Sequence, residues 1–297
     1  MKIGIVISGG DVSGINNFIF QVAKLASAEI TIFNGGIPGL LDKNHQEIAW
    51  RDLVDFSICS LPVITSGRTT RKLLRSEYET IARKIKSLRL DVLIMAGGDG
   101  SLQFLNTLSE FDINCFGVGM TIDNDVYGSD YTIGFSTACE QIIKEVSRLR
   151  NTGRALPGRV FMVEILGGHC GELTLQSAIK SNADIALIPE AQMPLEDLAE
   201  RVRRKLREQN SVVILCSEGY TREYSPGFQG AIDTMIKQLE PRIGVRIRKT
   251  IIGYGLRSGD PTCEEIYQGT IMANEVVRCI QSGMKNKAII INSSNKP

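Results

Sequence analysis

Short apolar runs recur along the chain, and most are followed by a segment with helical periodicity. They are rich in isoleucine, valine and leucine without polar alternation, which is typical of strands covered on both faces of a parallel sheet. The runs are Ile3–Ser8, Ile30–Phe33, Val92–Ala96, Asn114–Val118, Val160–Leu166, Ile185–Ile188, Val212–Cys216, Ile251–Tyr254 and Ala288–Ile291. In Ser76–Arg89 and Leu195–Gln209, apolar residues three or four positions apart predict amphipathic helices. This alternation predicts an α/β protein with mostly parallel sheets and right-handed crossovers.

The length of 297 residues suits one large domain or two of ordinary size. The stretch Asn151–Gly158, N-T-G-R-A-L-P-G, contains two glycines and a proline and is the best candidate for a hinge or flexible loop. We therefore expect two α/β lobes, each with a mostly parallel sheet flanked by helices.

Charge and composition narrow the choice of partners. The 34 Lys+Arg residues nearly balance the 33 Asp+Glu residues, which argues against nucleic acid and against an anionic membrane. No apolar run approaches the roughly 20 residues of a membrane span. The seven cysteines are scattered without C-x-x-C spacing, so we expect reduced thiols and a cytoplasmic protein. Two histidines argue against a histidine-rich metal site.

Two of the predicted strands end in acidic, glycine-rich turns. Ser8–Gly14 (S-G-G-D-V-S-G) follows the first strand, and Gly97–Ser101 (G-G-D-G-S) follows Val92–Ala96. Glycines there let the backbone approach a ligand, and the helix that follows offers free N–H groups to a phosphate. Neither turn fits the G-x-G-x-x-G or Walker pattern. A single such turn is equally typical of a plain structural turn, but two after buried strands favour phosphate binding.

The acidic residues in these turns need their own explanation. A carboxylate beside a polyphosphate is repulsive unless a cation lies between them, and Mg²⁺ suits both kinds of oxygen. Asp99 is therefore the candidate Mg²⁺ ligand, although an aspartate at this position could instead cap the helix that begins near Ser101. A third acidic segment, Thr121–Asp125 (T-I-D-N-D), follows the run that ends at Val118.

Phosphoryl transfer to a hydroxyl needs a carboxylate that orients the hydroxyl and accepts its proton. Asp123 could be that base, with Asp125 fixing its geometry or contacting the substrate. The alternative is that D-N-D is simply a turn after a strand.

In this order, the motifs resemble those of the phosphofructokinase family. The resemblance includes the two glycine turns, T-I-D-N-D, and Asp130–Phe135 (D-Y-T-I-G-F). It continues through Glu164–Gly167, Cys170-Gly171, Ser217-Glu218, Ile252-Gly253 and Arg257–Pro261, so it covers nearly the whole chain. The resemblance implies an ATP- or pyrophosphate-dependent sugar-phosphate kinase. It also implies a phosphoryl-donor lobe of residues 1–135 with 256–297 and a sugar-phosphate lobe of 136–255.

The resemblance implies a role for each matching position. Asp123 matches the catalytic base, with Thr121 and Asp125 beside it at the sugar. The donor and Mg²⁺ site would use Gly10, Arg68, Gly98, Asp99, Gly100 and Ser101. The acceptor site would use Leu166, Gly167, Glu218 and Tyr254, with Arg159, Arg248 and Arg257 gripping the acceptor's phosphate. In the family, the first two of these arginines come from a neighbouring subunit, which implies a homo-oligomer, a dimer or a tetramer. Each arginine could instead be a surface residue in an ion pair.

Several positions depart from the family pattern. Met120 stands where ATP users carry glycine and pyrophosphate users carry lysine, whereas Gly100 matches the ATP type. Phe104 weakens the case for ATP because small residues usually stand there, and Tyr254 replaces a histidine.

Gly168 replaces an arginine that would stabilise the transferred phosphoryl group, and Arg71 and Lys72, near Arg68, could compensate. We expect ATP as donor and fructose 6-phosphate as acceptor. The alternatives are pyrophosphate, another sugar phosphate, or a non-catalytic paralogue that binds these ligands.

Overall fold

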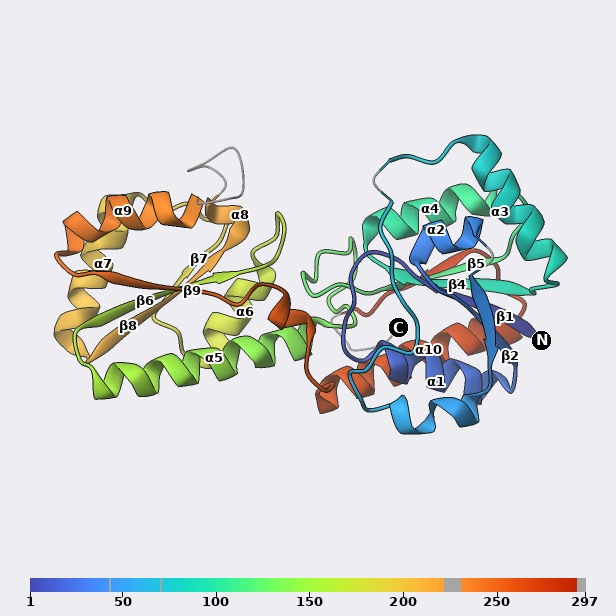
Figure 1. Cartoon of the computed structure of the whole chain (residues 1–297), viewed down its shortest axis with the longest axis horizontal. Coiled ribbons are helices and arrows are strands. Elements are labelled where there is room, and N and C mark those ends of the chain that lie inside the picture. The colour runs from blue at the N-terminus through green and yellow to red at the C-terminus, as the bar shows by residue number, and fades with distance from the viewer. Residues whose placement is uncertain (43, 70, 222–230, 293–297) are drawn as a thin grey trace. The chain divides into compact units, whose positions relative to one another are not determined.

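The computed structural model describes residues 1–42, 44–69, 71–221 and 231–292. The chain forms two compact units, Met1–Thr137 with Arg257–Pro297 and Ala138–Leu256 (Figure 1). It passes from the first unit to the second within a single helix, α5 (Phe135–Ala155). Among the described residues, no helix has both the length and the apolar character needed to cross a membrane.

The first unit is a six-stranded sheet in the order β10-β5-β4-β1-β2-β3. Its strands are β1 (Lys2–Ile7), β2 (Glu29–Phe33), β3 (His45–Ile48), β4 (Val92–Gly97), β5 (Cys115–Gly119) and β10 (Lys287–Ile289). Its helices are α1 (Ile15–Ala26), α2 (Gly36–Leu41), η1 (Trp50–Phe56), α3 (Arg75–Ser87), α4 (Asp99–Ser109) and α10 (Cys263–Gln281). All strand pairs are parallel except β2 with β3.

The first unit has helices on both faces of this sheet. Helices α1 and α10 lie on one face, and α2, α3 and α4 lie on the other (Figure 1). The apolar residues of β1 and β4 are fully buried because both faces are covered. The strand order reverses between β1 and β4, since the chain proceeds from β1 to β2 on one side and from β4 to β5 on the other. Such a switch point leaves a crevice at the carboxyl ends of the strands, where ligands bind in α/β proteins.

The second unit is a four-stranded parallel sheet in the order β7-β8-β6-β9. Its strands are β6 (Arg159–Ile165), β7 (Ile185–Leu187), β8 (Ser211–Ser217) and β9 (Ile247–Ile251). Its helices are most of α5, α6 (Glu172–Ser181), α7 (Leu195–Glu208), α8 (Glu218–Thr221), α9 (Ala231–Ile243) and η3 (Gly253–Arg257). Helices α5 and α6 lie on one face of the sheet, and α7 and α9 lie on the other (Figure 1).

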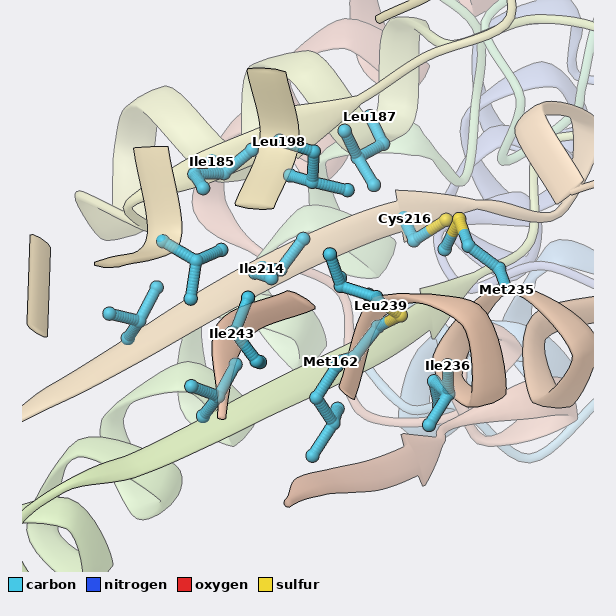
Figure 2. Packing of buried hydrophobic residues seen from close by; sticks show 14 of the residues in the cluster. Met162, Ile185, Leu187, Leu198, Ile214, Cys216, Met235, Ile236, Leu239 and Ile243 are labelled. Carbon is cyan, nitrogen blue, oxygen red and sulfur yellow. The ribbon is translucent and has the colours of Figure 1, made fainter. Parts of the chain in front are cut away.

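The core of the second unit lies between the sheet and helices α7 and α9. Met162 of β6 and Ile214 of β8 point toward Leu198 of α7 and toward Met235 and Leu239 of α9 (Figure 2). These side chains are fully buried. The helical periodicity of the sequence therefore produces the expected packing of an apolar helix stripe on a sheet.

The structure confirms the predicted fold class and corrects several details of the elements. Strand β9 is Ile247–Ile251 and not Ile251–Tyr254, and residues 253–257 form a 3-10 helix instead. The antiparallel strand β3 was not predicted. The hinge predicted at 151–158 is wrong, because residues 151–155 belong to α5 and the units divide at 137/138 and 256/257.

Candidate active site

The carboxyl ends of β1, β4 and β5 surround a hollow of about 400 Å³ in the first unit. Its lining includes Gly10, Arg68, Gly98, Asp99, Gly100, Ser101, Thr121, Asp123, Asp125 and Arg257, all of which were predicted site residues. It also includes Ser8, Gly9, Ile37, Thr69 and Met120, which the sequence analysis did not name as site residues, although Ser8 and Gly9 belong to the first glycine turn and Met120 stands at a position that varies with the donor. Ser8, Gly9 and Thr69 are neighbours of predicted residues, so only their positions in the motifs could have indicated them.

The turn after β1 is held against a distant segment of the chain. Gly9 has a φ of 110°, a left-handed conformation that favours glycine. Its N–H donates to the carbonyl of Gly67 at 3.2 Å, and its own carbonyl accepts from Nε of Arg68 at 3.1 Å. The segment around Arg68 is thereby fixed beside the first glycine turn.

The turn after β4 leads directly into helix α4. A Cβ atom on Gly97 would overlap the carbonyl of Ser8 and the hydroxyl of Ser101, so only glycine fits between the two turns. Gly98 and Gly100 instead face open space. The N-terminal end of α4 borders the hollow and carries the positive end of the helix dipole. This arrangement suits a phosphate.

The T-I-D-N-D segment forms a rigid turn at the end of β5. The carbonyl of Thr121 accepts from the hydroxyl of Thr132 at 2.7 Å, and the N–H of Asp123 donates to the Thr121 hydroxyl at 3.2 Å. Asn124 is left-handed, with φ of 55°, and its amide donates to the carbonyl of Asp130 at 3.1 Å. Asn124 therefore anchors the turn, while the aspartates on either side of it line the hollow.

The aspartates of the hollow repel one another. Partial burial raises the pKa of Asp125, and the negative charge of Asp99 raises it further. Within the described part of the chain, no three His, Cys, Asp or Glu side chains are grouped so as to hold a metal. Two carboxylates nevertheless fit Mg²⁺, because Mg²⁺ is usually held by one or two carboxylates together with phosphate oxygens and waters.

The remaining predicted donor residues, Arg71 and Lys72, lie outside the hollow lining. Both Nη atoms of Arg71 donate to the carboxylate of Glu77, at 2.8 and 2.7 Å. This bidentate ion pair at the start of α3 keeps Arg71 beside Glu77, and it lowers the pKa of Glu77 to about 2. Phe104 is buried in the core above the sheet, where its ring stacks on that of Tyr78 at 5.2 Å.

Arg257 lies beside the first glycine turn. Its Nη1 donates to the carbonyl of Asp11 at 3.3 Å, and a Cβ atom on Gly10 would overlap its guanidinium. The structure thus places Arg257 among the predicted donor-site residues, although the resemblance had implied that it grips the acceptor's phosphate.

In the second unit, Leu166, Gly167 and Glu218 come together where β6 and β8 end. The carboxylate of Glu218 accepts from the N–H of Gly167 at 3.1 Å and of Gly168 at 2.8 Å. Glu164 is a further acid at this edge, and burial together with the charge of Glu218 raises its pKa. The apolar run of β6 indicated no role for Glu164, although this residue begins the segment Glu164–Gly167 that resembles the family.

Arg159 and Arg248 lie near the N-terminal ends of the strands of the same sheet, whereas Glu218 follows the C-terminal end of β8. Arg159 is the first residue of β6, and Arg248 pairs with Phe161 near that end. The seven residues of β6 span roughly 20 Å at about 3.3 Å per residue, so Arg159 does not share a site with Glu218 of its own chain. Arg248, opposite Phe161, lies about 13 Å from the end of the strand that leads to that site. Tyr254, in η3, is 82% exposed.

Comparisons with known proteins place this architecture in context. The family model for phosphofructokinase matches residues 2–280. A "Probable ATP-dependent 6-phosphofructokinase" of Mycoplasma pneumoniae is 33% identical, covering 100% of this chain and 89% of its own. A "Pyrophosphate--fructose 6-phosphate 1-phosphotransferase" of Dictyoglomus thermophilum is 29% identical, covering 95% and 87%. A solved phosphofructokinase of Saccharomyces cerevisiae has the same fold, with a TM-score of 0.85 and 24% identity, covering 99% of this chain and 44% of the yeast chain.

Proposed function

The chain belongs to the phosphofructokinase family, and we propose that it transfers the γ-phosphate of ATP to a hydroxyl of fructose 6-phosphate, giving fructose 1,6-bisphosphate. The observation that carries this proposal is the position of Asp123, whose turn lines the same hollow as both glycine turns. A base and a phosphate cradle within one hollow meet the main requirements of phosphoryl transfer, which are positioning and charge stabilisation.

Each part of the hollow has a role in this reaction. The carboxylate of Asp123 accepts the proton of the attacking hydroxyl, and the rigid turn around Asn124 keeps that carboxylate in position. The N-terminal amides of α4 and the guanidinium of Arg68 bind phosphate oxygens. Thr121 lies beside the base, where its hydroxyl orients the turn.

Mg²⁺ fits the acidic side of the hollow. Asp99 would hold the ion directly or through water, with Asp125 beside it. When bound, Mg²⁺ supplies positive charge that neutralises polyphosphate oxygens. The pKa of Asp125 is raised chiefly by burial and further by the charge of Asp99, and a cation bound between the two carboxylates would relieve that repulsion.

ATP is the donor that Gly100 favours. Gly100 lies in the first turn of α4, and open space surrounds the position of a Cβ atom there, which leaves room for a nucleotide beside the helix. Pyrophosphate is the alternative donor. It is supported by the pyrophosphate-dependent relative.

The acceptor site is proposed to form from two copies of the chain. Leu166, Gly167 and Glu218 would contact the sugar. Tyr254 would make a neutral contact to its phosphate, and Arg159 and Arg248 of a neighbouring subunit would bind that phosphate. The positions of these two groups toward opposite ends of the strands of one sheet support a homo-oligomer with shared sites. Sedimentation of the wild type would measure the assembly state. Mixing Glu218→Gln and Arg248→Ala chains would restore part of the activity if the sites are shared.

The central test is a panel assay with Asp123→Asn. Wild-type protein is offered ATP or pyrophosphate with several sugar phosphates, and product formation is measured. We expect Asp123→Asn to lower kcat by about 100-fold or more, in line with the usual contribution of a general base. Asp112→Asn is the matched control, because it makes the same chemical change at a 95%-exposed side chain. Binding of both ligands without turnover by wild type would indicate a non-catalytic paralogue instead.

A further inference from the structure

The T-I-D-N-D turn after β5 is held by the loop that follows it, residues 129–132, which we call the support loop. The side-chain amide of Asn124 donates to the carbonyl of Asp130 at 3.1 Å. The hydroxyl of Thr132 donates to the carbonyl of Thr121, the first residue of the turn, at 2.7 Å. The turn is therefore fastened to the support loop at two points, and a shift of the loop would move the turn.

The support loop is bound in its own right to a residue from the far end of the sequence. The N–H of Asp130 donates to the carbonyl of Ile291 at 2.7 Å, and the N–H of Ile291 donates to the hydroxyl of Ser129 at 3.2 Å. The same hydroxyl donates to the carbonyl of Tyr131 at 2.7 Å. The hydroxyl of Ser129 thus joins two residues of the loop and accepts from Ile291, whose side chain is fully buried.

The position of Ile291 is set by strand β10, which ends two residues before it. Strand β10 pairs in parallel with β5, and Ile289 lies opposite Val118. Two neighbouring strands of one sheet therefore fix both sides of this connection. Strand β5 leads into the T-I-D-N-D turn, and β10 leads into the residue that holds the support loop.

We infer that Ser129 and Ile291 are positioning residues for Asp123, acting through the support loop and Asn124. This inference rests on the proposed function, in which Asp123 is the base. Among the described residues that line the hollow, neither Ser129 nor Ile291 is present, so both act on the reaction only through the turn. The effect on rate is large because a displacement of about 1 Å in a reacting group can cost about 100-fold.

Steady-state kinetics of Ser129→Ala and Ser129→Thr test this role. Ser129→Ala removes the hydroxyl that accepts from Ile291, and we expect kcat to fall by about tenfold or more. The KM for ATP should change by less than about threefold, because the glycine turns are untouched. Ser129→Thr keeps the hydroxyl and should keep most of the kcat. A wild-type kcat for Ser129→Ala would overturn the inference.

Ser87→Ala is the matched control for the loss of a serine hydroxyl. Ser87 is an exposed residue of α3 in the same unit, and its hydroxyl also donates to a backbone carbonyl, that of Lys84, at 2.8 Å. We expect its kcat to stay within about twofold of wild type. A loss equal to that of Ser129→Ala would show that position 129 has no special role.

A double variant with Asp123→Asn separates positioning from a general weakening of the fold. If Ser129 acts through the carboxylate of Asp123, Ser129→Ala should lower the residual kcat of Asp123→Asn by less than about twofold, because the group that it positions is no longer a base. A weakened fold would lower kcat by the same factor in both backgrounds. Equal factors would therefore contradict the inference.

Ser129→Cys keeps the test decisive if the alanine variant does not fold. A thiol is close to a hydroxyl in size but is a weak donor and a weak acceptor, so kcat should again fall while circular dichroism matches wild type. Failure of the proposed function looks different. In that case Asp123→Asn itself would keep the wild-type kcat, whereas a large loss in Asp123→Asn with unaffected Ser129 variants would remove the inference alone.

Discussion

A buried glutamate, Glu265, holds the first unit together at the start of helix α5. Its side chain is fully buried and lies in the first turn of α10. The carboxylate accepts from the N–H groups of Gly134 and Thr137, at 2.5 and 3.2 Å, and from the hydroxyls of Ser136 and Thr137, at 3.0 and 3.1 Å. We predict that Glu265→Ala strongly destabilises this unit.

The magnitude follows from the groups left without an acceptor. Each buried N–H that loses its partner costs about 1–3 kcal/mol, so the two amides together cost about 2–6 kcal/mol. The Ser136 hydroxyl is left out of this sum because it also lies 2.8 Å from the Thr262 hydroxyl, and loss of the Thr137 hydroxyl's acceptor would only add to the total. Glu265→Gln keeps one acceptor oxygen and should lose about half as much.

Trp50 provides a fluorescence probe for the unfolding of the first unit. It is the only tryptophan of the chain, and its ring packs against Phe20 of α1, the helix that contacts α10. Urea unfolding followed by tryptophan fluorescence therefore reports on this unit. Glu79→Ala is the control, since Glu79 is an exposed glutamate of helix α3 in the same unit and faces the exposed Arg75 at 3.9 Å. We expect it to change the free energy of unfolding by less than about 1 kcal/mol. If Glu265→Ala were as stable as this control, the reasoning from buried hydrogen bonds would be refuted.

Three other predictions concern the hollow and the thiols. Gly97→Ala should destabilise the protein by about 1–3 kcal/mol in urea unfolding, because its new methyl group has no room between the glycine turns; an unchanged midpoint would contradict this. Since burial, and in addition the charge of Asp99, raise the pKa of Asp125, protons compete with Mg²⁺ at higher pH than for a free aspartate. Mg²⁺ binding measured by calorimetry should therefore weaken as pH falls through that raised pKa, and a constant affinity between pH 7 and 4 would refute it. Burial raises the pKa of Cys115 to about 12, so in the native state a disulfide reagent should modify exposed Cys263 rapidly and Cys115 only after unfolding.

Local sequence patterns were sufficient to predict the fully buried strands and the turns that follow them. The runs in β1, β4 and β5 are continuous and apolar because helices cover both faces of the sheet. Strands with exposed side chains were missed or misplaced, because they lack a continuous apolar run. Strand β3 reads H-Q-E-I, and edge strand β9 reads I-R-K-T-I with partly exposed residues. The helical stretch Asn151–Ala155 was mistaken for a hinge because its polar residues and glycine carry little local helix signal.

By itself, the sequence indicated which carboxylates and glycines stand directly after buried strands, where backbone geometry brings them to the carboxyl end of one sheet. Arg68 was indicated only by the resemblance of its segment to the family. Tertiary structure alone decided the strand order that makes this end of the sheet a crevice. It also decided that Arg257 reaches Gly10, that Arg159 lies a whole strand away from Glu218, and that Glu265 holds the start of α5. The physical reason is the distance along the sequence over which each kind of interaction acts. Periodicity and turn residues act over a few positions, whereas contacts between residues more than a hundred positions apart depend on how the elements pack.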